Sequence, residues 1–317
     1  MSVESESGEL PETFESRIEA LGNAVSIESV SKVHWQVCSD ITRRNGRTFY
    51  FASQLLPPQA RRAVHAVYAY CRIADDYADR VAEGGVDWAR CQLAAWEAGL
   101  DQPVHDVAIA FSAVRHHYAI DSTLARDLLS GVQSDLESRR FDDWDTLRYY
   151  CYQVAGTVGL MVAPILGCGP TGLYRAEAMG IGMQLTNIIR DVGEDAAMGR
   201  VYLPDEDLYR FGVDRDELLR GNVTGDFEGL LAFEIARARA LYQEAEVGVP
   251  SLSPWAQFAV LASAKLYGQI LDRVEAQGFD VMNMRAHVTT SRKVASMPRV
   301  AVSLAAIQAR SRLGGLS

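Results

Sequence analysis

The stretch DDYAD at residues 75–79 recurs in altered form as DVGED at residues 191–195, and these two stretches guide the interpretation of the whole chain. Each places two aspartates four residues apart, namely Asp75 and Asp79, then Asp191 and Asp195. Residues four apart share one face of a helix, where like charges repel each other. Because this unfavourable spacing of like charges occurs twice, we predict that the carboxylates hold cations between them.

Each acidic pair continues a polar row along the same helix face. Tyr68 and Arg72 precede the first pair, and Gln184 and Asn187 precede the second. A solvated surface face would explain one such row, but two rows favour a binding site. Clustered carboxylates with arginines nearby suit Mg²⁺, or Mn²⁺ in its place, bound together with phosphate oxygens. Zinc is disfavoured because no histidine or cysteine lies at ligand spacing.

Composition indicates a large globular protein of the cytoplasm. The chain has 317 residues, 48% of them hydrophobic, which is enough for a sizeable core. Its net charge of -10 argues against a nucleic-acid partner. Five scattered cysteines without a CxxC motif indicate reduced thiols. Residues 1–27 are predicted to be an acidic, disordered tail without signal-peptide character, and residues 28–317 a single domain.

Apolar residues at helical spacing fill most of the chain, and clear strand alternation is absent. The spacing predicts an all-α fold with long helices at 58–82, 121–138, 174–196, 228–246 and 254–277. Pro58 and Asp121 are typical of helix starts. The segment 149–174 has no charged residue and is long enough to span a membrane. Its glycines and Pro164 favour instead a helix buried inside the protein and interrupted near that proline.

Four motifs carry a resemblance to a known family. They are RTFYFASQLLP at 47–57, YAYCRIADD at 68–76, YCYQVAGTVG at 150–159, and QLTNIIRDVGED at 184–195 followed by GRVYLP at 199–204. In this order they resemble the squalene/phytoene synthases, which join two isoprenyl diphosphates head to head. The resemblance covers residues 40 to about 300. It implies an isoprenoid synthase helical bundle with a central cavity, and a prenyltransferase that condenses two allylic diphosphates through a cyclopropyl diphosphate.

The resemblance also implies roles for individual residues. The expected Mg²⁺ ligands, which would act in catalysis, are Asp75, Asp79, Asp191 and Asp195. The expected contacts to the diphosphates are Arg47, Arg72, Arg190, Arg200, Gln184 and Asn187. The aromatic residues expected in the cavity, where they could stabilise a carbocation, are Phe49, Tyr68 and Tyr150. Tyr150 is also a candidate for passing a proton to the released diphosphate. The roles of Asp76 and Glu194, which lie beside the acidic pairs, stay open.

Within the family, the residues of these motifs most resemble those of the phytoene synthases of carotenoid biosynthesis. We therefore expect two C20 geranylgeranyl diphosphates to form phytoene without NADPH. A synthase making squalene, dehydrosqualene or presqualene diphosphate from C15 farnesyl diphosphate is the first alternative. A non-catalytic lipid-binding or assembly relative is the second, although all four aspartates are present. Because substrates and product are lipids, weak peripheral association with membranes is expected. The oligomeric state and the terminating base stay open.

Overall fold

The computed structural model describes residues 26–137 and 139–314, and within them every regular element is helical. The α-helices in chain order are α2 (Lys32–Asn45), α3 (Arg47–Ser53), α4 (Pro58–Asp79), α5 (Val81–Gly84), α6 (Val86–Ala98), α7 (Asp106–His117), α8 (Ser122–Ser134), α9 (Trp144–Cys151), α10 (Thr157–Val162), α11 (Leu173–Ala197), α12 (Asp205–Arg210), α13 (Arg215–Leu219), α14 (Phe227–Val247), α15 (Pro254–Ala276) and α16 (Thr290–Gly314). This confirms the all-α fold class. The predicted acidic tail, apart from residues 26 and 27, lies outside the described residues.

The five long helices predicted from the sequence are confirmed as α4, α8, α11, α14 and α15. Local chemistry accounts for where they begin. Pro58 occupies the first turn of α4, where its missing N–H costs nothing. The Asp121 side chain caps α8 by accepting a hydrogen bond from the Thr123 amide at 2.9 Å. The predicted ends of α4 and α8 at 82 and 138 fall a few residues too late, because each helix stops at a cap position.

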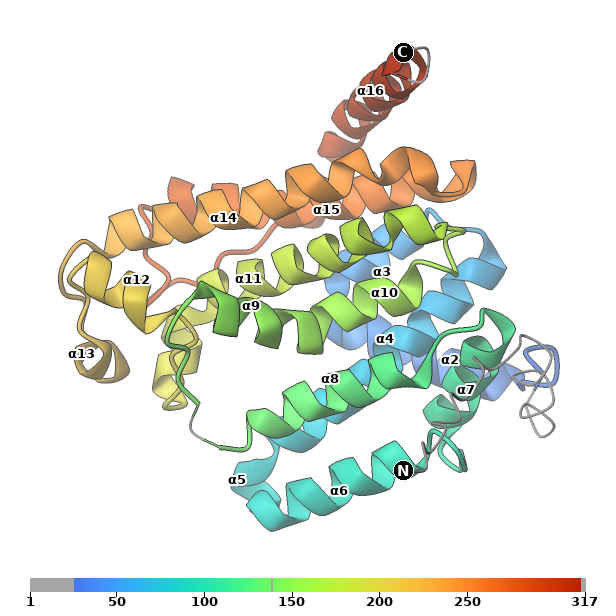
Figure 1. Ribbon diagram of the computed structural model, residues 1–317, viewed down its shortest axis with the longest axis horizontal. Helices are drawn as coiled ribbons and strands as arrows, with labels where there is room; N and C mark the ends of the chain where they lie inside the picture. The colour runs from blue at the N-terminus through green and yellow to red at the C-terminus, as the bar shows by residue number, and fades with distance from the viewer. Residues whose placement is uncertain (1–25, 138, 315–317) are drawn as a thin grey trace, which may run out of the picture.

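Helix α11 lies at the centre of the bundle (Figure 1), packed against α14, α10, α15 and the short π-helix η1 (Tyr152–Gly156). A second group, α2, α4 and α7, packs together beside it. One apolar core surrounds α4 and α7, and another surrounds α11 and α14. Val154, on η1, packs against both cores. The cavity described below lies between these two groups of helices.

The uncharged segment 149–174 is not one continuous helix. It passes from α9 through η1 into α10, which ends at Val162, before Pro164. This confirms the predicted interruption near the proline. Most of the segment is buried or half-buried, although Tyr149 is 55% exposed. Among the residues that the structure describes, no helix is both long and apolar enough to span a membrane.

A buried ionic cluster joins α14 to α12. Glu234, with no exposed surface, accepts a hydrogen bond from the Arg237 guanidinium at 2.8 Å, and Arg237 also contacts Asp207 at 3.0 Å. One cation thus faces two buried carboxylates. Burial raises the pKa of Glu234 to about 7, and Asp207 reinforces this while Arg237 opposes it. A buried carboxylate without full compensation keeps its proton to higher pH.

This cluster predicts a pH-dependent stability. The folded state holds the Glu234 proton up to about pH 7, whereas the unfolded chain releases it near 4.5. The folded state therefore binds more protons between these values, and its stability falls as the pH rises through this window. In Glu234→Gln this contribution is absent, and the amide oxygen can still accept from Arg237. We expect the variant to gain stability relative to the parent between pH 5 and pH 8, on the order of 2–3 kcal/mol.

Urea unfolding at a series of pH values measures the gain. A constant stability difference between Glu234→Gln and the parent across this range would show that Glu234 is ionised throughout the range in the folded protein.

Candidate active site

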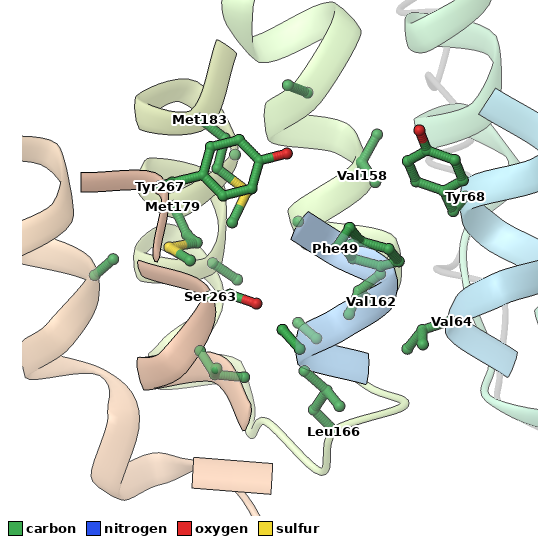
Figure 2. Close-up of a pocket in the computed structure, with 18 of the residues that line it drawn as sticks. Phe49, Val64, Tyr68, Val158, Val162, Leu166, Met179, Met183, Ser263 and Tyr267 are labelled. Atoms are coloured by element: carbon green, nitrogen blue, oxygen red, sulfur yellow. The ribbon is translucent and has the colours of Figure 1, made fainter. Parts of the chain in front are cut away.

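A long cavity runs between α4, α10, α11 and α15, and most of its wall is apolar. Figure 2 shows Tyr68 and Tyr267 on opposite walls, with Phe49, Val162 and Leu166 along the cavity. The rings of Phe49 and Tyr68 stack with centroids 5.1 Å apart. Polar residues also belong to the wall. Four of them come from the two predicted polar rows, namely Arg72, Asp75, Gln184 and Asn187, while Ser53, Arg175 and Ser263 lie outside these rows. The cavity therefore combines an extended apolar surface with a short polar one.

The aspartates of the site belong to helix ends. Asp75 and Asp79 lie in the last turn and a half of α4, and Asp191 and Asp195 lie in the last two turns of α11. A fifth carboxylate, Asp135, is the C-cap residue of α8. The C-terminal end of a helix carries partial negative charge, so each of these positions is unfavourable for an anion. Carboxylates at the C-terminal ends of α4, α8 and α11 therefore favour the binding of a cation at these helix ends.

The two acidic pairs, with the polar residues that precede them (here called the two acidic rows), share electrostatic partners in the folded protein. Burial raises the pKa of Asp75 to about 7, Arg72 opposes the shift, and Asp79 and Asp135 add to it. Burial likewise raises the pKa of Asp195 to about 7, with Asp191 and Asp135 adding and Arg200 opposing. Asp135 thus acts on both rows. Burial works against the charge of Arg200, but Asp135 and Asp79 hold its pKa above the usual value.

Two of the four aspartates, Asp79 and Asp191, are in direct contact with arginines. On α4, Arg72 donates to Asp76 at 2.5 Å and reaches Asp79 at 3.4 Å. On α11, Asp191 accepts hydrogen bonds from Arg190 at 2.7 and 2.5 Å and from Arg285 at 3.1 Å. Asp75 has a different environment, since it faces the cavity. The Nε atom of Arg72 is buried without a hydrogen-bond partner among the described residues, so part of this guanidinium is free to bind a ligand.

Asp135 organises a hydrogen-bonded network that the sequence did not reveal. The hydroxyl of Tyr150 donates to Asp135 at 2.6 Å, and that of Tyr202 donates at 3.3 Å. Arg200 donates to the Asp135 carbonyl at 3.3 Å. Tyr150 is only 3% exposed and is not among the residues that line the cavity, which differs from its expected position there. Its ring packs against Phe141 and Tyr202, and its hydroxyl reaches the acidic end through Asp135.

Two cations from the C-terminal part of the chain also reach the site. Arg285 contacts Glu194 at 3.2 Å as well as Asp191. Lys293 is buried and donates to Thr48 at 2.9 Å. Burial lowers the pKa of Lys293, and the nearby charge of Arg47 lowers it further. Lys293 thereby links the start of α16 to the start of α3.

The residues present fit a hard divalent cation bound with a diphosphate. Their acidic donors are carboxylates, which supply the oxygen ligands that Mg²⁺ prefers. The described residues contain no ready-made cage of three or more histidine, cysteine or acidic side chains. Mg²⁺ commonly uses only one or two carboxylates and completes its shell with water and substrate phosphate. Asp75 and Asp195 are half-buried carboxylates, each with a pKa raised to about 7, and a bound divalent cation would stabilise their ionised form.

Fold and site together define a class of protein: an all-helical bundle with an apolar cavity and a polar end rich in carboxylates and arginines. The family model for squalene/phytoene synthases matches residues 42–292, and the chain belongs to this family. Phytoene synthase 3 of Zea mays is 36% identical over 287 residues, 87% of this chain and 67% of the maize protein. The 15-cis-phytoene synthase of Synechococcus elongatus is 36% identical and covers 86% of this chain and 94% of its own length.

Solved structures support the same assignment. A dehydrosqualene synthase in complex with a ligand superposes with a TM-score of 0.79 at 33% identity, covering 87% of this chain and 98% of that one. A squalene synthase from Alicyclobacillus acidocaldarius gives a TM-score of 0.71 at 26% identity, covering 80% of this chain and 98% of the other. These similarities confirm the expected isoprenoid synthase fold.

Proposed function

We propose that this protein is a phytoene synthase, which condenses two C20 geranylgeranyl diphosphates head to head into phytoene. The observation that carries the proposal is the joining of an extended apolar cavity to a polar end built from two acidic rows and several arginines. The cavity suits isoprenyl chains, and the polar end suits their diphosphates. The phytoene synthases of maize and Synechococcus, each 36% identical, support this choice of product.

The proposed metal ligands are Asp75, Asp79, Asp191 and Asp195. When bound, Mg²⁺ would supply the positive charge that stabilises a departing diphosphate. Arg72, whose Nε atom is unpartnered, would donate to the same diphosphate oxygens. Arg190 and Arg285 now neutralise Asp191, and they would turn toward the diphosphate once the carboxylate binds metal. Arg47 and Arg200 would add fixed positive charge from the start of α3 and beside Asp195.

The cavity wall would protect and guide the reacting carbocation. Loss of the first diphosphate leaves a cation at its carbon, and the double bond of the second substrate attacks that carbon. Phe49, Tyr68 and Tyr267 present aromatic rings to the cavity, where they can stabilise the cation. Gln184 and Asn187, which also line the wall, would hydrogen-bond the head group. The largely apolar wall keeps water away from the cation.

A proton must leave the hydrocarbon at the end of the reaction. The released diphosphate is one acceptor. The pair Tyr150 and Asp135 is well placed to pass that proton onward, since their 2.6 Å hydrogen bond lies at the acidic end. Burial holds the pKa of Tyr150 well above its usual value, so its hydroxyl stays protonated and acts as a relay or a donor.

A second candidate is a synthase acting on the C15 farnesyl diphosphate. The observation that favours it is the structural similarity to a dehydrosqualene synthase at 33% identity over 87% of the chain. The two candidates differ in the length of the isoprenyl chain that the cavity must hold.

Competition between the two substrates tests the proposal. With Mg²⁺ present, we expect kcat/KM for the C20 diphosphate to exceed that for the C15 diphosphate by at least about tenfold, because each additional buried methylene contributes about 0.8 kcal/mol. A preference for the C15 diphosphate would support the second candidate.

A further inference from the structure

Helix α16 differs from the rest of the bundle in its charge. After Asp280 the chain contains no aspartate or glutamate, yet it contains six arginines and lysines in a protein of net charge -10. Five of these cations belong to α16: Arg292, Lys293, Arg299, Arg310 and Arg312. Figure 1 shows α16 projecting from the bundle beyond α14 and α15. The helix is therefore a basic extension on an otherwise acidic protein.

One face of α16 is accounted for by packing. Val300, only 1% exposed, packs with Val249 and with residues of α15, and Met297, Leu304 and Ile307 extend this contact. The spacing of these four residues follows the helical period, so they form a single inner face.

The outer face is also apolar, which packing does not explain. An exposed stripe of small apolar residues, here called the outer stripe, follows the helix at positions i, i+7, i+8 and i+11: Val294, Ala301, Val302 and Ala305. Val294 is 56% exposed and Val302 is 71% exposed. A basic row, also spaced by whole turns, follows the side of the helix nearer α15: Arg292, Arg299 and Arg310. Arg299 lies one turn before Val302 of the outer stripe, and Arg292 and Arg299 line the rim of a groove between α16 and α15. Within the described residues, no member of the basic row forms an ion pair with an acidic side chain.

We propose that the outer stripe and the basic row of α16 form a docking surface for an anionic lipid bilayer. An exposed apolar stripe flanked by arginines is the pattern of helices that lie in the membrane interface. Each arginine near an anionic surface adds attraction, whereas the acidic body of the protein is repelled. The protein would therefore bind such a surface through α16 in one orientation.

If the protein has the proposed function, the location of α16 places the docking surface close to the cavity that holds the lipid product. Val249 and Val260 line the cavity, and both belong to the cluster that packs against α16. The apolar cavity and the docking helix are therefore separated by one layer of side chains. A lipid product leaving the cavity there would meet the bilayer after a short path.

Binding to lipid vesicles, without substrate, tests the docking surface independently of the reaction. The full chain is sedimented with vesicles of phosphatidylcholine alone or with added phosphatidylglycerol. We expect binding to the anionic vesicles only, weakening as salt is raised. Arg299→Glu and Val302→Asp should each lower the binding constant by about tenfold. Two controls should bind like the parent: Arg90→Gln on α6, which Figure 1 places at the opposite end of the view, and Val104→Asp, at an 88% exposed valine. Arg299→Gln is compared with Arg90→Gln, because Arg90 is paired with Glu137 and a glutamate there would add repulsion.

Each other outcome would overturn the proposal. Parental binding that does not depend on anionic lipid, or no binding at all, would contradict it directly. An equal loss in Arg299→Gln and Arg90→Gln would show a general effect of net charge. Unchanged vesicle binding in the α16 variants, combined with dissociation of a dimer in light scattering, would show that the outer stripe binds a second copy of the chain. Thermal melting of all the variants confirms that each one folds.

Discussion

Asp75→Asn is expected to lower turnover by roughly three orders of magnitude while the protein stays folded. Asp75 is the acidic residue of the first stretch that lines the cavity, and burial raises its pKa to about 7. An amide at this position cannot provide the charge that binds a divalent cation. Because a half-buried carboxylate near a helix C-terminus is itself unfavourable, the melting temperature without metal should stay level or rise.

Asp76→Asn is the matched control for this variant. Asp76 is the next residue along the chain, but its side chain is 44% exposed and accepts a hydrogen bond from Arg72. An asparagine there can still accept that bond, so we expect a loss smaller than about tenfold. Removal of metal by EDTA should abolish turnover in the parent, and Mg²⁺ should restore it. Full activity in EDTA, or an active Asp75→Asn with greatly reduced stability, would contradict the proposed metal site.

Gly180→Ala is expected to destabilise the protein by about 1–3 kcal/mol. A methyl group on Gly180 of α11 would lie 2.2 Å from the backbone carbonyl oxygen of Ala155 on η1. Gly159 of α10 makes a similar approach to α11, since a Cβ atom there would lie 2.1 Å from the Ala176 carbonyl oxygen. Backbone atoms cannot move aside as a flexible side chain can, so the helices would have to separate. Both glycines line the cavity, so its shape depends on this close contact.

Gly268→Ala provides the control within a long helix of the same bundle. Gly268 lies in α15, and a Cβ atom there would have no neighbour within 4 Å. Alanine favours a helix over glycine by up to about 1 kcal/mol, so this variant should be as stable as the parent or more stable. Urea unfolding of the three proteins measures the difference. Equal stability of Gly180→Ala and Gly268→Ala would show that α11 and η1 can separate without cost.

The parts of the site that could be predicted are those with a short-range pattern. The spacing of Asp75 and Asp79 indicated a shared helix face, and the same helical spacing added Arg72 to the first row and Gln184 and Asn187 to the second. All four of Arg72, Asp75, Gln184 and Asn187 line the cavity. The long helices could also be predicted from the sequence, because apolar residues recur at helical spacing and a proline or a capping aspartate marks where a helix begins.

The parts that could not be predicted depend on contacts between distant segments. Asp135 is a lone acidic residue at a helix end, and only the folded bundle brings it to Tyr150 and to both acidic rows. Arg285 is 94 residues from Asp191, with no spacing to connect them. The position of Tyr150 outside the cavity wall goes with its packing against Phe141 and Tyr202 and its hydrogen bond to Asp135, which no local pattern encodes. These long-range contacts set the electrostatics of the site.

Product identification with and without NADPH tests the central proposal most directly. The purified protein is incubated with Mg²⁺ and geranylgeranyl diphosphate, and the hydrocarbon is analysed by chromatography and mass spectrometry. A phytoene synthase ends its reaction by losing a proton, so we expect phytoene without NADPH, and neither rate nor product should change when NADPH is added. Accumulation of the cyclopropyl diphosphate without NADPH, and its reduction to squalene or a longer homologue when NADPH is supplied, would contradict the proposal.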